Sequence, residues 1–180
     1  SIGDLVITLS GEPQTLRWIG RRQVSADEFA ARQTVRPVLI RRNAFGQDRP
    51  FADLMVSPSH RIVVEGWAAE IIAGTESVLV QAAHLINDHS VSRCTRPFEF
   101  SYYHLLFDHH EVMFTNGLPT ESLFLGEMAR TSFPKADLLE LERLYPAVIT
   151  HFANRATVLP CLRRHEVAPL VQMVLPSRLN

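Results

Sequence analysis

Over its first two thirds the chain consists of short apolar runs that turn-forming residues interrupt every few positions. The runs are rich in β-branched, leucine and aromatic side chains, and Gly, Pro, Asn and Asp separate them. Such a pattern is typical of many short strands and argues against a βαβ arrangement. The runs that predict strands are residues 5–9, 16–19, 35–40, 54–56, 61–64, 78–81, 101–106 and 111–115. We therefore expect a mainly β protein.

The two ends of the chain carry further local signals. A Ser10-Gly11-Glu12-Pro13 turn between the first two runs predicts an N-terminal hairpin. In the tail the apolar period changes, and residues 134–145 predict an amphipathic helix that stops before Pro146. A second helix is expected over residues 163–173, interrupted by Pro169. We expect the helices to lie largely after Glu121.

Composition narrows the classes of partner. The chain has 180 residues, the size of one domain with a sizeable core. Its net charge of −1 gives no electrostatic footprint for nucleic acid or an anionic membrane, so we expect neither partner. No apolar run approaches the roughly 20 residues that span a bilayer. Cys94 and Cys161 could form at most one disulfide, which leaves the compartment open.

Two motifs stand out from this background. In Ser57-Pro58-Ser59-His60 a hydroxyl precedes a histidine by three residues, in a turn between two apolar runs. Proline presets φ for the second position of a type I turn, which would direct the two side chains to one side. Asn116-Gly117 ends the last predicted strand and is typical of a tight hairpin turn. The alternative is that Ser57 only caps a surface turn and His60 only packs.

These motifs, with Gly3-Asp4 at the start and the runs at residues 80–85 and 103–106, resemble the Hint domain. This is the self-cleaving β-fold of inteins and of the hedgehog C-terminal domain, and the resemblance is to its bacterial stand-alone form. It implies a horseshoe-shaped β-domain over residues 1–125 and a helical extension over residues 126–180 packed on it. It also implies that the family's first strand and its nucleophile lie upstream of this chain.

The resemblance implies autoprocessing. In that reaction a thiol or hydroxyl attacks the preceding carbonyl, and a second nucleophile opens the resulting thioester or ester. His60, on the family's catalytic turn, would protonate the leaving nitrogen, and Ser57 would bind the same peptide or orient His60. His104 stands where inteins carry an acidic residue, and Glu111 where they carry a histidine. We take His60, Ser57 and His104 as the candidate catalytic residues.

His109 and His110 are further candidates for assistance. For both of them, as for His104, the alternative is an ordinary strand-surface or core histidine. Departures from the family pattern limit the expected activity. Without the nucleophile we expect self-acting autoproteolysis only in the parent protein, with the upstream segment of its own polypeptide as partner, and no activity of this chain alone.

Two further departures exclude related reactions. No His-Asn pair follows Asn116-Gly117, and Asn180 follows Arg178-Leu179, so we expect no splicing. Gly20 stands where hedgehog proteins carry the aspartate that activates cholesterol, so we expect no sterol transfer.

Other classes of function remain as alternatives. The main one is an inactive Hint-fold binding or presentation module. A metal site could draw on His60, His84, His89, His104, His109 and His110, but no His-x-x-x-His or Cys-x-x-Cys pair occurs. A serine hydrolase lacks its Gly-x-Ser-x-Gly elbow here. We expect no cofactor and no metal, while the oligomeric state, the second nucleophile and the compartment stay open.

Overall fold

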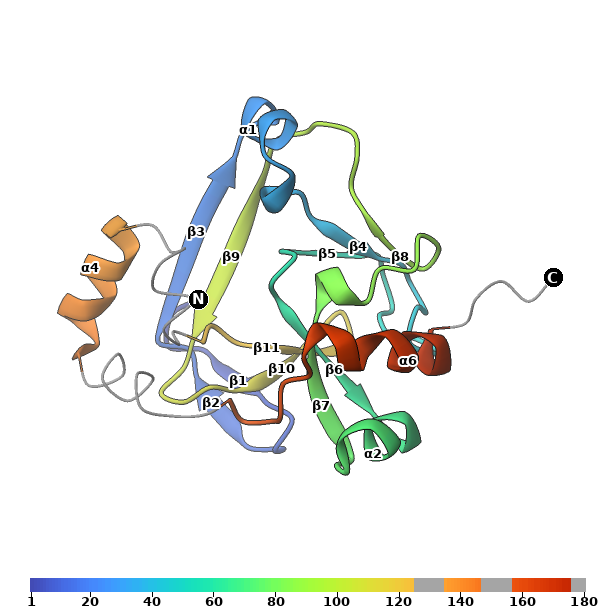
Figure 1. Ribbon diagram of the computed structural model, residues 1–180. Coiled ribbons are helices and arrows are strands. Elements are labelled where there is room, and N and C mark those ends of the chain that lie inside the picture. The colour runs from blue at the N-terminus through green and yellow to red at the C-terminus, as the bar shows by residue number, and fades with distance from the viewer. Residues whose placement is uncertain (125–134, 147–156, 176–180) are drawn as a thin grey trace. The chain divides into compact units, whose positions relative to one another are not determined.

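A computed structural model describes residues 1–124, 135–146 and 157–175 (Figure 1). The chain divides into two compact units, whose segments alternate along the sequence. Unit 1 consists of Ser1–Arg21, Tyr103–Met113 and Glu121–Val158, and unit 2 of Arg22–Tyr102, Phe114–Thr120 and Leu159–Asn180. Each unit contains apolar clusters of its own.

The described strands form four small sheets, which confirms the prediction of a mainly β chain. The sheets have the strand orders β1-β2, β3-β9, β5-β4-β8 and β10-β11-β6-β7. The strands are β1 (Leu5–Ile7), β2 (Pro13–Thr15), β3 (Trp18–Val24), β4 (Val38–Ile40), β5 (Leu54–Val56), β6 (Arg61–Glu65), β7 (Ser77–Gln81), β8 (Val91–Arg93), β9 (Phe100–Leu106), β10 (Val112–Thr115) and β11 (Leu118–Glu121).

The described helices are short. They are α1 (Ala26–Ala31), α2 (Trp67–Ala73), α4 (Lys135–Leu144) and α6 (Arg164–Val174), with 3₁₀ turns η1 (Gln33–Val35) and η2 (Ala82–His84). The helices expected in the tail are confirmed, although α6 runs through Pro169 without interruption. Helices α1 and α2, which lie before Glu121, were not predicted. In the part of the chain that the structure describes, no helix is long and apolar enough to cross a bilayer.

Unit 1 begins with the expected hairpin, but its second strand lies earlier than predicted. Residues Leu5, Val6 and Ile7 pair with Thr15, Gln14 and Pro13 of β2. The pairing ends at Leu16, whose amide donates to the carbonyl of Asp4 at 2.9 Å. The amide of Arg17 then donates to Leu106 instead, at 2.8 Å. This change of partner explains why residues 16–19 do not form the hairpin's second strand.

Helix α4 packs on an apolar cluster of unit 1. Trp18, Leu106 and Leu141 are buried together, with Leu138 and Tyr145 packed against them. Leu138, Leu141 and Tyr145 recur at the spacing of one helical face. The Tyr145 hydroxyl donates to the carbonyl of Arg17 at 2.6 Å, which fixes the end of α4 on the unit.

Unit 2 contains the largest apolar core. Strands β4, β6, β7 and β8 each contribute buried valine or isoleucine side chains to it, and α6 contributes Val167 and Leu170. All five residues of β6 pair with β7, from Arg61 opposite Gln81 to Glu65 opposite Ser77. Val63 and Leu79 are buried as fully as their neighbours on the same strands. Strands β6 and β7 are therefore buried on both faces, which is typical of strands that carry continuous apolar runs.

The free edge of β7 is covered by the chain that leads into α6. The amide of Leu79 donates to the carbonyl of Pro160 at 2.7 Å, and the amide of Leu162 donates back to Leu79 at 3.0 Å. Cys161 therefore forms an isolated parallel bridge with Leu79. Cys94 and Cys161 are not joined in a disulfide.

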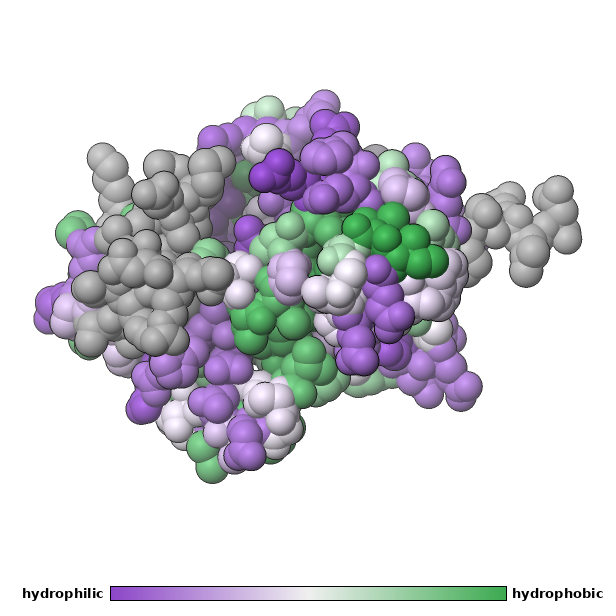
Figure 2. Space-filling view, turned by 60° about the horizontal axis from the view of Figure 1, so that its bottom comes forward, coloured by the Kyte–Doolittle hydropathy of each residue, from purple (hydrophilic) through white to green (hydrophobic). Residues whose placement is uncertain are grey.

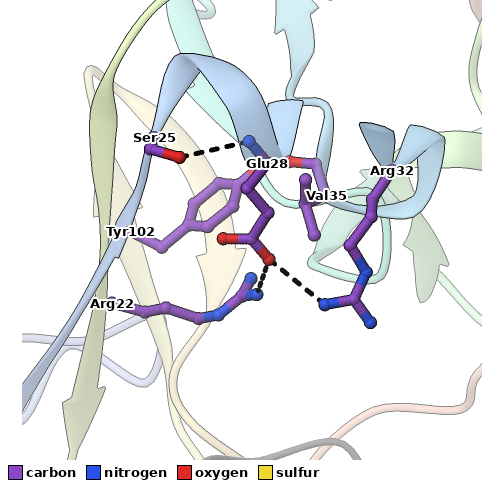
Figure 3. Close-up of polar contacts among 6 residues, drawn as sticks. All are labelled: Arg22, Ser25, Glu28, Arg32, Val35 and Tyr102. Atoms are coloured by element: carbon purple, nitrogen blue, oxygen red, sulfur yellow. Dashed lines mark hydrogen bonds and ion pairs between the residues drawn. The ribbon is translucent and has the colours of Figure 1, made fainter. Parts of the chain in front are cut away.

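Helix α1 closes a smaller aromatic cluster of unit 2. Ser25 caps the helix by accepting from the amide of Glu28, and the Glu28 carboxylate binds Arg22 at 2.7 Å and Arg32 at 3.3 Å (Figure 3). Beneath it, Phe29 packs with Phe98, Phe100 and Tyr102. The Tyr102 hydroxyl donates to the carbonyl of Val35 at 3.0 Å, and burial raises the pKa of Tyr102 well above its ordinary value.

Hydrophobic residues also reach the surface. Figure 2 shows them gathered on the face that is turned to the viewer. In unit 2, α2 exposes Trp67 and Ile71, which lie one helical turn apart. In unit 1, the exposed apolar residues include Leu5 and Ile7 on one face of β1.

Candidate functional site

The Ser57–His60 motif forms the predicted turn between β5 and β6. The amide of His60 donates to the carbonyl of Ser57 at 3.1 Å, which closes a four-residue turn with Pro58 in its second position. Strand β5 is fixed on β4 through the pairs Val38 with Val56 and Ile40 with Leu54. Proline suits this place because its fixed φ is that of the second turn residue and its missing N–H is not needed there.

Two further backbone hydrogen bonds hold the turn from the side of η2. The amide of Ala82 donates to the carbonyl of His60 at 2.8 Å, and the amide of Ala83 donates to that of Pro58 at 2.9 Å. Three of the turn's carbonyl groups, those of Ser57, Pro58 and His60, are therefore engaged. The backbone that carries His60 is fixed by the same sheet that forms the core of unit 2, so the imidazole projects from a rigid support.

The side chains of Ser57 and His60 are both half-buried. The Ser57 hydroxyl lies 3.5 Å from the hydroxyl of Ser59, a distance at the weak limit of hydrogen bonding. A hydroxyl held this loosely is available to turn toward another acceptor. His84 follows directly on η2, and burial, then the charge of Arg164, lower the pKa of its imidazole.

His104 lies on β9 in unit 1, whereas Ser57 and His60 lie in unit 2. Its side chain is half-buried. The joint catalytic role expected for His60, Ser57 and His104 therefore stays a prediction.

His109 and His110 are placed differently from each other. His109 is exposed, whereas His110 is 7% exposed and lies at the base of the β10–β11 hairpin. The amide of Val158 donates to Nδ1 of His110 at 3.1 Å, and Nε2 lies 3.4 Å from a carboxylate oxygen of Glu121. The burial of His110 agrees with the alternative that it is a core histidine.

The sequence analysis does not single out Glu121 or Ser122, although the Asn116-Gly117 turn sets the register that places them. Asn116 and Gly117 have φ values of 50° and 79°, which confirms the predicted two-residue hairpin turn. Such a turn places Glu111 opposite Ser122. The amide of Ser122 indeed donates to the carbonyl of Glu111 at 2.8 Å, and the amide of Glu111 donates to the Ser122 hydroxyl at 2.9 Å.

A metal site was the other use considered for the histidines. Among residues 1–124, 135–146 and 157–175, no group of three or more His, Cys, Asp or Glu side chains is placed to hold a metal ion.

Comparison with known families decides the assignment. A family model described as Hint domain matches residues 1–127. This chain belongs to the Hint domain family. The match includes the Ser57–His60 turn, the Asn116-Gly117 turn and every strand that the structure describes, and it confirms the family resemblance. Hint domains are generally associated with autoprocessing. No curated protein and no solved structure matches the chain.

Proposed function

We propose that this Hint domain serves autoprocessing of its parent polypeptide, by an N-to-S or N-to-O acyl shift at the junction before the domain. The sulfur or oxygen of a side chain attacks the carbonyl carbon of the preceding peptide bond. The carbon–nitrogen bond then breaks, a thioester or ester forms, and the nitrogen leaves as an amine. A second nucleophile opens the ester and frees the upstream segment, which is the partner of the reaction.

His60 supplies the proton that the leaving nitrogen needs. An amide nitrogen departs poorly unless it is protonated as the bond breaks, and a positioned general acid accelerates such a step roughly 10² to 10⁴-fold. Imidazole suits this role because it ordinarily gives up a proton near neutral pH. The observation that supports the proposal is the clamped turn, in which η2 fixes the backbone on both sides of Ser59.

Ser57 has the supporting role. Its hydroxyl would bind the scissile peptide or orient His60, and the loose contact with Ser59 leaves it able to do so. His104 would assist from β9. We propose no splicing, because the Asn116-Gly117 pair is part of a hairpin whose next strand, β11, is buried.

The experiment is a fusion in which a carrier protein precedes the chain and a junction strand beginning with cysteine is supplied between them. Cleavage would be followed by gel electrophoresis and mass spectrometry, with and without dithiothreitol. We expect cleavage at the cysteine junction that thiols accelerate, since thiols open a thioester. A junction beginning with alanine is the matched control and should stay intact.

The alternative is an inactive Hint-fold module that binds or presents another segment. It gives no cleavage with cysteine at the junction, with or without thiol. An intact fusion that is folded by circular dichroism would therefore favour this alternative over autoprocessing.

A further inference from the structure

The His110 ring is enclosed within unit 1 and faces a different partner at each nitrogen. Its centroid lies 4.9 Å from that of the Phe124 ring, and only 7% of the residue is exposed. Nδ1 accepts the amide of Val158, whereas Nε2 faces Glu121, which is itself 7% exposed. The autoprocessing proposed above makes no use of this buried pair.

The contact at Nδ1 determines which tautomer is present. A ring nitrogen that accepts a hydrogen bond has no proton, so the neutral ring carries its proton on Nε2. On that side of the ring Nε2 lies near the Glu121 carboxylate, although no hydrogen bond joins the two groups. The 3.4 Å separation is within ion-pair range, but Nε2 has no hydrogen-bond partner there, so this side of the ring is held by weak attraction alone.

Protonation of the ring would act oppositely on its two sides. Both nitrogens of an imidazolium are donors. An N–H at Nδ1 would meet the N–H of Val158, and two donors that face each other repel. The charge would at the same time attract the Glu121 carboxylate, which compensates it inside the unit. Unit 1 can therefore accept the proton without an unpaired buried charge, while the contact with Val158 is lost.

The geometry points to His110 as a pH-sensitive latch, which holds the chain at Val158 while the ring is neutral and releases it when the ring is protonated. The contact is present while the ring is neutral and is lost when the ring is protonated. Among the residues that the structure describes, the charged side chain that faces the ring is Glu121 of β11. The titratable neighbours of His110 in the sequence are Asp108, His109 and Glu111, and Asp108 binds Arg17.

The test is nuclear magnetic resonance on the full ¹⁵N-labelled chain. Long-range ¹H–¹⁵N correlation spectra would report the tautomer and the titration of His110, and the Val158 amide signal would be followed over the same pH series. We expect a neutral ring protonated on Nε2, and a Val158 amide that loses its hydrogen-bond protection with the same midpoint as the ring. A ring protonated on Nδ1 at high pH, or a Val158 amide that ignores the titration, overturns the latch.

Two variants test whether the pH response of the Val158 amide comes from His110 or from the protein as a whole. In His110→Asn the amide oxygen stands near the place of Nδ1 and accepts without titrating, so Val158 should stay bonded and unresponsive to pH. In Glu121→Gln the carboxylate charge is lost, and both midpoints should move together to lower pH. An equal response of Val158 in wild type and His110→Asn overturns the latch. Because no readout depends on cleavage, these outcomes are independent of the autoprocessing proposal.

Discussion

The indole ring of Trp18 occupies the space beside Gly20 on strand β3. A Cβ atom on Gly20 would lie 2.1 Å from Cη2 of Trp18 and 2.4 Å from Cζ3. Residues two apart on a strand share a face, which brings the ring over its neighbour. Trp18 is itself buried with Leu106 and Leu141, so the ring has little freedom to move away. This packing explains physically why Gly20, and not an aspartate, stands at this position.

Any side chain at Gly20 should destabilise unit 1. We expect Gly20→Ala to lower the free energy of unfolding by about 1 to 3 kcal/mol, the usual cost of overpacking. The measurement is a urea unfolding curve. In a Trp18→Leu background the same substitution should cost less, because the ring that it meets is gone. Equal costs in both backgrounds would contradict the packing argument.

The histidine of the clamped turn should dominate the chemistry. In the cysteine fusion, His60→Ala should slow the acyl shift by roughly 10² to 10⁴-fold. Ser57→Ala should cost less, since one neutral hydrogen bond contributes about 0.5 to 1.5 kcal/mol. His104→Ala tests the assisting role proposed on β9. The control is His89→Ala, an exposed histidine whose loss should leave the rate unchanged. A normal rate in the His60 variant would make that histidine structural.

The half-buried imidazole of His84 on η2 should make stability depend on pH. Burial, then Arg164, lower the pKa of His84 below the ordinary value of 6.5 in the folded state, so the unfolded chain binds the proton more readily. Stability from this group is present above 6.5 and is lost as pH falls toward the lowered value. We expect His84→Gln to flatten the decline of the urea midpoint in this range. An unchanged slope would show that His84 is not its source.

The hydroxyl that fixes the end of α4 should have a measurable effect. Tyr145→Phe removes the 2.6 Å hydrogen bond to Arg17 and should cost about 0.5 to 1.5 kcal/mol of unfolding free energy. Leu141→Ala, which opens a cavity in the same cluster, should cost about 2 to 5 kcal/mol. If the tyrosine variant were the more damaging of the two, the hydroxyl would have a role beyond this single bond.

The sequence predicted strands well where apolar runs and turns coincide. Strands β5, β6, β7, β9 and β10 lie where the runs were, and the Asn116-Gly117 turn is confirmed by its two positive φ values. Strands β8 and β11 were missed because they are short and contain mostly residues other than the β-branched and aromatic ones typical of strands. In β11 a proline, a threonine and a glutamate hide a fully buried strand, which only the register of the hairpin places opposite β10.

The missed helix α1 did have a local signature. Ser25 is followed three residues later by Glu28, the pattern of a capping box, and Ser25 does cap the helix. Helix α2 has only its flanking glycines, Gly66 and Gly74, as signals. The Ser57–His60 turn was predictable because proline fixes a local geometry. The register of the Asn116-Gly117 hairpin brings Glu121 close to His110, but the polar residues of β11 hid this pairing in the sequence.

The apolar core of unit 2 includes residues that lie outside the part of the chain that matches the family. Family identity extends over residues 1–127, yet Leu162, Val167, Leu170 and Leu175 complete the core that the matched strands begin. A polypeptide cut after residue 127 would keep every motif that the family match includes. It would also bare the backbone of Leu79 along β7, an open edge that invites pairing with strands of other molecules. The residues that identify this chain as a Hint domain therefore do not include all of the residues that build its core.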